Sequence, residues 1–440
     1  MPRAIREGCG RNAPSYLLMK IQSYFRVLLL CLWCATASAQ TATVDKTIVD
    51  PGSPNLFFES ISLALNEKTR QTLVTWERHP GNHPGHSTFS RKLTRAGNLS
   101  SSTKTLVNGT NTYDPGIVYN KNKNEFAMIY ADEIGGALHA IYIQALTKAG
   151  QKKGSPVKVS TDSGSAFVNQ GPELEYDPVQ RVYVAAWQRS ATSGAGNENG
   201  IYAAILNEQF QILFGPELIL TPVTQAFPDV ADIAITSAGK VVIGISRFVN
   251  DNPLRVNYIV ASMNQDLTGL VLSKLNGNPS GPQIPDLEFV SLTSEFLAYF
   301  TDTNGIRKRK INPQGKPSGV RSSAFAGSLK KKKLLLPVVV ALPAPSGAVH
   351  GFLVASEDPG QLLGAGKLWG QPLDANGKAL GRPLQLDSNF VALHSPAMSA
   401  LPPSASGHPQ FALFYSDGGQ RFLPPQGESS ALIYLKITLN

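Results

Sequence analysis

An internal repeat constrains what this chain can fold into more than any other feature of its sequence. The repeating unit is an apolar strand, a polar turn, a second apolar strand that often ends in an aromatic residue, a variable loop and two further strands. Its third strand returns at intervals of 48 to 64 residues, the length that four short strands and their loops require. Residues at equivalent positions of the first two strands are 11 apart in the first three copies: Leu65 and Trp76, Tyr119 and Tyr130, and Tyr176 and Trp187.

The repeat predicts an all-β fold, a seven-bladed β-propeller of four-stranded antiparallel blades that forms one domain over 40–440. Val, Ile, Tyr, Phe and Leu dominate the strands, and no apolar stripe of helical period exceeds two turns. Six or eight blades stay open, whereas stacked sandwiches or a β-helix fit the repeat length less well. The copies run roughly over 52–110, 111–166, 167–224, 225–280, 281–329, 330–388 and 389–440.

The two ends of the repeat predict how a ring of blades closes. The seventh copy stops at its third strand, 432–439, and so lacks a fourth. An unassigned strand at 43–49 precedes the first copy. Pairing the two segments would remove two open sheet edges, which otherwise promote aggregation. We therefore expect the N-terminal strand to complete the last blade.

The first 39 residues have the pattern of a signal peptide. Basic residues precede a short apolar stretch at 27–33, and 37–39 has the small-x-small pattern of signal-peptidase sites. Cleavage between Ala39 and Gln40 would give a secreted or otherwise extracytoplasmic chain. The apolar stretch is shorter than the ~20 residues of a membrane-spanning helix, which disfavours an anchor. Met19 is an alternative initiation site that would leave a shorter leader.

Composition narrows the chemistry of the exported part. All three cysteines, Cys9, Cys31 and Cys34, lie in the leader, so the exported part has no disulfide, thiol nucleophile or thiolate metal site. The leader holds five basic residues and one acidic residue, so its removal lowers the net charge from +9 to +5. The chain has no phosphate-binding glycine loop that opens a helix and no Gly-x-Ser-x-Gly nucleophile elbow.

Much of the positive charge lies in one segment. Residues 307–333 contain ten basic residues and no acidic residue. Clustered cations attract polyanions, so we predict a non-enzymatic binding or scaffold protein that contacts an anionic glycan, lipopolysaccharide or protein surface through the channel-mouth face near the fifth and sixth blades. Nucleic acid is not expected for an exported chain, the oligomeric state stays open, and the alternative is a solvated surface without a partner. The predicted polyanion-binding residues are Arg307, Lys308, Arg309, Lys310, Lys330, Lys331, Lys332 and Lys333.

A histidine-rich loop is the candidate site for a cofactor, a divalent metal ion. His79, His83 and His86 are three of the seven histidines and closely follow Glu77. Neutral imidazoles are good ligands for zinc, copper or nickel. Their spacing matches no standard zinc motif, so the alternative is a surface loop with incidental histidines and no cofactor.

Acidic residues two positions past the expected ends of the second strands, at the mouth of the predicted channel, support an alternative function, a carbohydrate-active enzyme that is a glycoside hydrolase or lyase. Carboxylate pairs carry out glycoside hydrolysis, and a ring of carboxylates could also bind calcium. A chain that leaves a sheet for water places polar residues at the same points, so a structural role is the other interpretation. The candidate carboxylates are Asp132, Asp302, Glu357 and Asp417.

The segment 160–167 reads Ser-Thr-Asp-Ser-Gly-Ser-Ala-Phe. It resembles the Asp-box of sialidases, a Ser-x-Asp-x-Gly-x-x-aromatic turn found in several blades of that propeller family. The resemblance implies a propeller fold. Because the family's arginine cluster and tyrosine nucleophile cannot be assigned to positions here, the resemblance implies no catalytic activity.

Overall fold

The chain divides into two units, residues 1–40 and Thr41–Asn440. The residues that the structure describes belong, apart from residue 40, to the second unit. The predicted signal peptide, its three cysteines, His83 and most of the Asp-box-like segment lie outside the described residues. Within those residues no helix is both long enough and apolar enough to cross a membrane. The computed structural model describes residues 40–52, 56–80, 85–100, 102–108, 111–135, 138–161, 167–191, 199–221, 228–249, 252–276, 287–292, 295–303, 305–357, 366–390, 393–417 and 430–440.

Strands dominate the described residues and form five four-stranded sheets and one eight-stranded sheet. Four sheets are continuous in sequence: β2 (Leu56–Asn66), β3 (Gln71–Pro80), β4 (Ser87–Leu93), β5 (Lys104–Val107); β14 (Pro228–Ile235), β15 (Val241–Val249), β16 (Asn252–Met263), β17 (Val271–Lys274); β18 (Leu287–Leu292), β19 (Glu295–Asp302), β20 (Gly305–Ile311), β21 (Pro317–Ser323); and β22 (Leu334–Ser346), β23 (Val349–Glu357), β24 (Gly366–Leu373), β25 (Leu384–Phe390). The fifth joins both ends of the unit: β1 (Ala42–Asp50), β28 (Ala431–Leu439), β27 (Gln410–Asp417) and β26 (Leu393–Leu401). The eight-stranded sheet contains β6 (Thr112–Asn120), β7 (Glu125–Gly135), β8 (Leu138–Leu146), β9 (Val157–Lys158), β10 (Phe167–Asp177), β11 (Val182–Ala191), β12 (Gly200–Asn207) and β13 (Ile212–Leu220). The helical element of this part is a short 3₁₀ turn, η1 (Gly327–Lys331).

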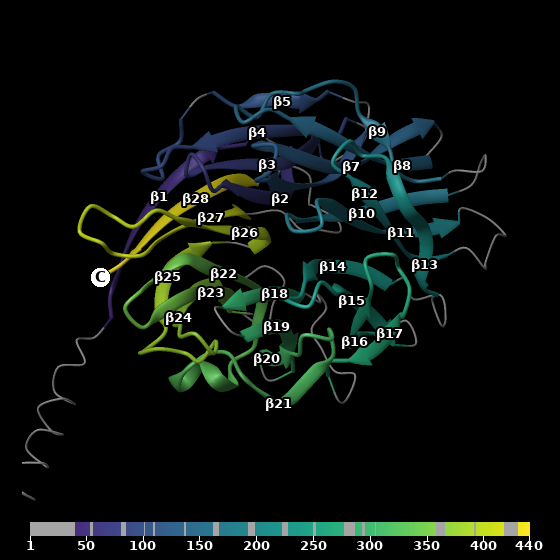
Figure 1. The fold of residues 1–440 in the computed structure, drawn as a ribbon. Coiled ribbons are helices and arrows are strands. Elements are labelled where there is room, and N and C mark those ends of the chain that lie inside the picture. Colours follow the sequence, from purple (N-terminus) through teal and green to yellow (C-terminus); the bar gives the residue numbers. More distant parts are fainter. Residues whose placement is uncertain are drawn as a thin grey trace, which may run out of the picture. The chain divides into compact units, whose positions relative to one another are not determined.

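The sheets are arranged in a ring (Figure 1). The strands β2, β6, β10, β14, β18, β22 and β26 contact one another in this order, and β26 contacts β2 again. β1 pairs antiparallel with β28, from Ala42 opposite Leu439 to Asp50 opposite Leu432. The chain thus has an all-β, propeller-like fold, and the predicted pairing of the N-terminal strand with the last sheet is confirmed.

The eight-stranded sheet differs from the separate copies that the repeat predicts. One parallel pair, Val168 opposite His139, joins β10 to β8. The side-chain amide of Asn169 donates a hydrogen bond to the carbonyl of His139 at 2.7 Å. This contact holds the start of β10 against β8, so the ladder runs across the predicted boundary at 166/167.

Aromatic residues in the middle of second strands fill the spaces between neighbouring four-stranded units, whereas the sequence predicts them at the strand ends. Trp76 of β3 belongs to the same buried cluster as Phe414 of the last sheet, and Trp187 of β11 packs in a cluster with Ile129 of β7, in the other half of the eight-stranded sheet. Sheets that diverge from a centre leave wedge-shaped gaps, which large rings fill well. Truncation of such a residue to alanine typically costs about 3–5 kcal/mol.

The first strands share a backbone distortion. Their pairing with the second strand shifts register at a bulge in β2, β6, β10, β14, β22 and β26. At this point Ser60, Asp114, Gly171 and Leu336 have φ values of 49°, 50°, 55° and 53°. A non-glycine residue at positive φ is strained by about 1–3 kcal/mol. The recurrence of this conformation in separate sheets indicates that it shapes the centre of the ring.

Candidate functional site

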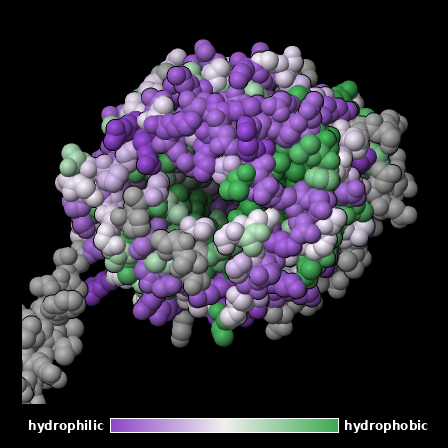
Figure 2. All heavy atoms as spheres, in the orientation of Figure 1, coloured by the Kyte–Doolittle hydropathy of each residue, from purple (hydrophilic) through white to green (hydrophobic). Residues whose placement is uncertain are grey.

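A cavity of about 400 Å³ lies where the first strands meet. Its walls come from β2, β6, β10, β14, β18, β22 and β26, with one residue from β15. Figure 2 shows the corresponding hollow near the centre of the face in view. Residues as distant in sequence as Ser60 and Met398 therefore face one space.

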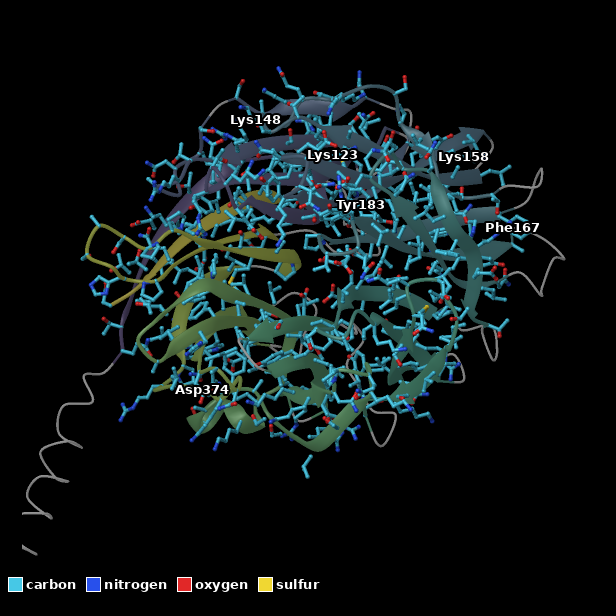
Figure 3. The ribbon with its side chains drawn as sticks, in the orientation of Figure 1. Lys123, Lys148, Lys158, Phe167, Tyr183 and Asp374 are labelled. Atoms are coloured by element: carbon cyan, nitrogen blue, oxygen red, sulfur yellow. The ribbon has the colours of Figure 1, made fainter. Side chains whose placement is uncertain are left out.

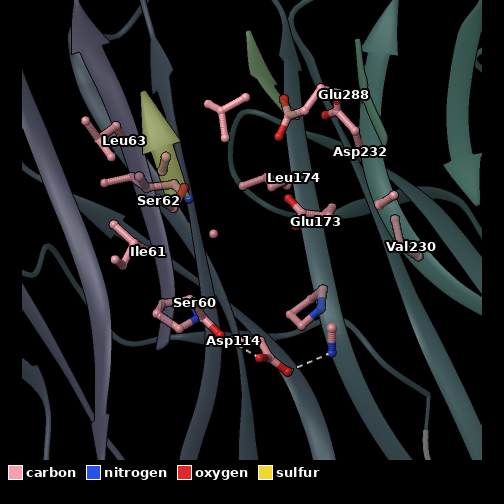
Figure 4. A pocket seen from close by; sticks show the side chains of 18 of the residues that line it. Ser60, Ile61, Ser62, Leu63, Asp114, Glu173, Leu174, Val230, Asp232 and Glu288 are labelled. Carbon is pink, nitrogen blue, oxygen red and sulfur yellow. Dashed lines mark hydrogen bonds between the residues drawn. The ribbon is translucent and has the colours of Figure 1, made fainter. Parts of the chain in front are cut away.

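One side of this cavity is strongly acidic. The described residues that line it include no Lys, Arg, His or aromatic side chain. Figure 4 shows Glu173, Asp232 and Glu288 along one wall. Low-dielectric walls focus the potential of such groups, which favours cations. The lining carboxylates are Asp114, Glu173, Glu175, Asp229, Asp232 and Glu288.

Two of these carboxylates also connect successive first strands. Asp114 accepts hydrogen bonds from the Ser60 hydroxyl at 2.8 Å and the Gly171 backbone N–H at 3.0 Å (Figure 4). Asp232 accepts one from the Phe289 backbone N–H at 2.6 Å. Within the described residues, adjacent first strands are not paired with each other through backbone hydrogen bonds. Side-chain hydrogen bonds therefore fix their spacing at the cavity.

Glu175 has altered acidity. Burial raises the pKa of Glu175 to about 8, and repulsion from Asp232 and Asp177 adds to the rise, although a hydrogen bond from the Tyr176 backbone lowers it. Glu175 thus keeps its proton at neutral pH next to a second carboxyl group. Such a pair can donate and accept protons within one cavity.

Apolar side chains also line the cavity. Those from β22 and β26 are Leu336, Val338, Val339, Ala397 and Met398, and none of the described lining carboxylates comes from these two strands. Others, such as Leu63, Leu174 and Val230, lie on the strands near the carboxylates. The cavity therefore offers both charge and hydrocarbon.

The carboxylates predicted from the sequence come from second strands, whereas those that line the cavity come from first strands. A sequence signal for the first strands did exist. Proline directly follows positions 114, 171 and 336, and proline inside a strand marks an edge or a bulge. The acidic residues around these bulges were therefore the candidates for a site in the first strands.

None of the predicted carboxylates is among the described residues that line the cavity. Asp132 lies within β7 and accepts a hydrogen bond from the Thr112 hydroxyl at 3.3 Å. Burial raises the pKa of Asp132. Asp302, Glu357 and Asp417 are the last residues of β19, β23 and β27, so they end strands instead of following them.

Two of those strand-ending carboxylates are paired with cations of the basic segment. Asp302 accepts a hydrogen bond from Arg321 at 2.8 Å. Glu357 bonds to Lys332 and accepts a hydrogen bond from the Trp369 indole at 2.9 Å. Burial raises the pKa of Glu357, but these two donors outweigh it and lower the pKa below its ordinary value. These contacts give both carboxylates a structural role.

The basic quartet on β20 is divided between the two faces of that strand. Arg307 and Arg309 lie on one face and Lys308 and Lys310 on the other, because side chains alternate along a strand. Arg309 donates to the Leu275 carbonyl at 3.0 Å, and Lys308 donates to the carbonyl of residue 377. The quartet therefore contacts both neighbouring sheets.

The second quartet comprises the last two residues of η1 and the two residues that connect η1 to β22. Lys332 is engaged with Glu357, the side chain of Lys331 lies outside the described residues, and Lys330 and Lys333 are exposed. None of the eight predicted residues lines the central cavity among its described walls. The exposed positive charge thus lies away from the acidic cavity.

The predicted histidine site is partly assembled. Glu77 and His79 share a face of β3, and His86 directly precedes β4 across the hairpin. Glu77, His79 and His86 are 2%, 7% and 3% exposed. One potential ligand atom from each lies within 4.8 Å of the others. His83 lies outside the described residues, and Glu77 is the third residue of the cluster.

Aromatic and acidic side chains surround this cluster. The rings of His79 and His86 stack at 4.4 Å, and Tyr113 packs on His86 at 4.2 Å. His86 Nδ1 contacts Glu77 Oε1 directly. Burial raises the pKa of Glu77 well above its usual value, with repulsion from Asp114 adding to the rise. Burial also lowers the pKa of His86 to about 4.

No protein-family model matches this chain, and no curated protein matches its sequence. Among solved structures it is similar to a protein of unknown function from Dyadobacter fermentans, with a TM-score of 0.51 and 10% identity over 90% of this chain and 99% of the other. A sialidase from Streptococcus pneumoniae has a TM-score of 0.45 and 10% identity over 88% of this chain and 69% of the other.

Other structures found include viral neuraminidase-like proteins and a β-1,3-galactosidase. The haemagglutinin-neuraminidase ectodomain of parainfluenza virus 5 has a TM-score of 0.44 and 10% identity over 97% of this chain and 96% of the other. At these identities the likeness concerns the fold alone. A function for this chain must therefore be argued from its own site.

Proposed function

We propose that this chain is an exported, non-enzymatic binding protein whose central cavity takes a small organic cation. The observation that carries the proposal is the cavity with six lining carboxyl groups, one of which, Glu175, keeps its proton at neutral pH, and, among its described lining residues, no basic side chain. An anionic ligand would meet repulsion there. A cation would relieve the repulsion among the carboxylates.

The size and shape of the cavity favour an organic cation over a bare metal ion. A volume of about 400 Å³ falls in the range of small-molecule sites, about 300–1,000 Å³. Apolar side chains such as Leu336 and Val338 line the cavity together with the carboxylates, and the methylene groups of a ligand would pack on them. A linear polyamine has ammonium groups for the carboxylates and methylene groups for the apolar side chains.

Spermidine is expected to bind the full chain at low salt and to bind the Glu173→Gln variant about tenfold more weakly. Glu173 lines the acidic wall, and the loss of one nearby unit charge corresponds to about 1–4 kcal/mol of attraction. Isothermal titration calorimetry measures both affinities. The affinity should also fall with added salt, since salt screens charges in contact with solvent.

An exposed carboxylate provides the matched control for this experiment. Glu217 lies on the outer strand β13, and Glu217→Gln should bind spermidine as the unchanged chain does. Equal affinity of the Glu173→Gln variant, or no binding by the unchanged chain, would contradict the proposal.

A carbohydrate-active enzyme is the second candidate, favoured by the protonated Glu175 beside Asp232. Glycosidases use one carboxylic acid as proton donor and a second carboxylate as base or nucleophile. A panel of glycans distinguishes the two candidates. Turnover that is abolished in Glu175→Gln would favour the enzyme, whereas spermidine affinity at pH 7 should change little in this variant because Glu175 is already mostly neutral.

The proposal includes seven blades. Each half of the eight-stranded sheet has four strands and contributes one strand, β6 or β10, to the cycle of first strands. Counting these halves separately gives seven four-stranded units, with β1 as the outer strand of the last. Export rests on the predicted leader, 1–39.

A polyanion-binding surface formed by β20 of the fifth unit and the segment that leads to β22 of the sixth also belongs to the proposal. Replacing Lys310, Lys330 and Lys333 together by Gln is expected to lower the salt concentration at which the chain elutes from a heparin column, because all three are exposed and clustered cations bind polyanions. Lys148 and Lys158 lie at the periphery elsewhere (Figure 3), and their double Gln variant is the control. Equal elution of both variants would exclude this surface.

A further inference from the structure

A second site lies in the β3–β4 hairpin, among residues that do not line the central cavity. We propose that Glu77, His79 and His86 bind a divalent transition-metal ion, zinc by the nature of the ligands, with one coordination position left open. This inference is independent of the cation-binding proposal for the cavity.

The backbone places the three side chains together. Glu77 and His79 are two residues apart on β3 and so project from the same face. Thr88 of β4 lies opposite Glu77 in the register, which brings His86, two residues earlier, back over the end of β3. The three potential ligand atoms lie within 4.8 Å of one another. In a tetrahedral site with bonds of about 2.0–2.1 Å, ligand atoms are about 3.3 Å apart, so small side-chain rotations complete the site.

The donor set selects the class of metal. Two imidazoles and one carboxylate are the protein ligands of a class of catalytic zinc sites, in which the fourth position holds water or substrate. Calcium and magnesium prefer sites made of oxygen atoms only. The exported part of the chain has no cysteine, so copper(I) and thiolate-bound ions are not favoured.

Neighbouring groups orient the ligands. The Nδ1 atom of His79 lies 3.2 Å from the Pro80 carbonyl; with Nδ1 as donor, Nε2 keeps the lone pair that a metal requires. The Asp114 backbone N–H donates to Glu77 Oε2 at 3.0 Å, which leaves Oε1 directed at His86. Hydrogen bonds of this kind fix ligand geometry in metal sites.

A further carboxylate lies beside the cluster. Glu59 Oε2 is 3.8 Å from His79 Nε2, and its side chain is 32% exposed. Glu59 can therefore occupy the fourth position or contact a metal-bound water, and it connects the buried cluster with solvent. The carboxylates of Glu59 and Asp114 each repel that of Glu77, and a dication would offset that repulsion.

Zinc titration of the metal-free full chain tests the site. Cys9, Cys31 and Cys34 should first be replaced by Ser, because thiolates of the leader would bind zinc themselves. We expect one equivalent of zinc by calorimetry, and cobalt(II) should give the absorption of a tetrahedral site. The Glu77→Gln and His79→Ala variants should each lose affinity about 100-fold or more, since even residues that only orient a ligand cost 10–100-fold.

Controls separate loss of a ligand from loss of the fold. His350→Ala, on β23, and His83→Ala should both retain zinc binding. Zinc should raise the melting temperature of the parent chain, because a ligand that binds only the folded state stabilises it, and should have no such effect on the folded Glu77→Gln variant. Absence of stoichiometric binding, or loss of binding in His83→Ala with retention in Glu77→Gln, would overturn the assignment.

Discussion

At pH 9 the Glu175→Gln variant is expected to be more stable than the unchanged chain by up to about 5 kcal/mol, and at pH 5 the two are expected to lie within about 1 kcal/mol of each other. The pKa of Glu175 is raised from 4.5 to about 8. Between these values the folded chain keeps a proton that the unfolded chain has released. The stability of the folded state therefore falls as the pH rises from about 4.5 to 8. Glutamine does not ionise, so the variant does not lose this stability as the pH rises.

Urea unfolding at intervals from pH 5 to pH 9 measures the difference. The charged groups that act on Glu175 are Asp232 from β14 and Asp177 on its own strand. Glu67 and Lys121 line a separate pocket together with Glu175. The exposed Glu217→Gln variant is the control and should retain the fall in stability. Parallel curves for the unchanged chain and Glu175→Gln would show that Glu175 is ionised in the folded state at neutral pH, and would remove its role in the cavity.

The arrangement of strands was predictable because it follows from local sequence. Leu65 and Trp76 lie on the paired strands β2 and β3, as their 11-residue spacing indicates. Apolar alternation, turn residues and repeat length are each properties of short segments. Pairing of the N-terminal strand with the last sheet was predictable from the missing fourth strand of the last copy, because unpaired strand edges at both ends of the repeat would otherwise stay exposed.

The lining of the cavity was not predictable in the same way. A shift of one residue moves every side chain of a strand to the other face, and the bulges introduce such shifts inside the first strands, where the repeat spacing does not reveal them. Glu173 and Glu175 alternate with apolar neighbours, as they would on any solvated strand. Which carboxylates meet therefore depends on contacts between distant strands.

The histidine cluster was predictable in part. The density of histidines within one loop indicated a site, and His79 and His86 do come together. The third member, Glu77, was noted only as a neighbour. The rule that residues two apart share a face of a strand would have assigned Glu77 to the site once β3 was extended through His79.

A disulfide between Thr43→Cys and Thr438→Cys is expected to form and to stabilise the chain by up to about 5 kcal/mol. These residues are opposite each other in the pairing of β1 with β28, and disulfides require Cα atoms about 4.4–6.8 Å apart. The bond would close a loop of roughly 400 residues, and the loss of entropy in the unfolded chain grows with loop length. The background for this experiment replaces Cys9, Cys31 and Cys34 by Ser.

The cavity exists only if first strands from the whole chain surround one centre, which requires the N-terminal strand β1 to pair with the C-terminal strand β28. Oxidation of the Thr43→Cys/Thr438→Cys protein, followed by mass spectrometry of the monomer and thermal unfolding, tests this pairing directly. The control pair Thr43→Cys/Lys436→Cys is two residues out of register and should remain reduced. An intramolecular bond with a raised melting temperature is the predicted result; free thiols in the monomer, or equal bonding in the control pair, would contradict the ring.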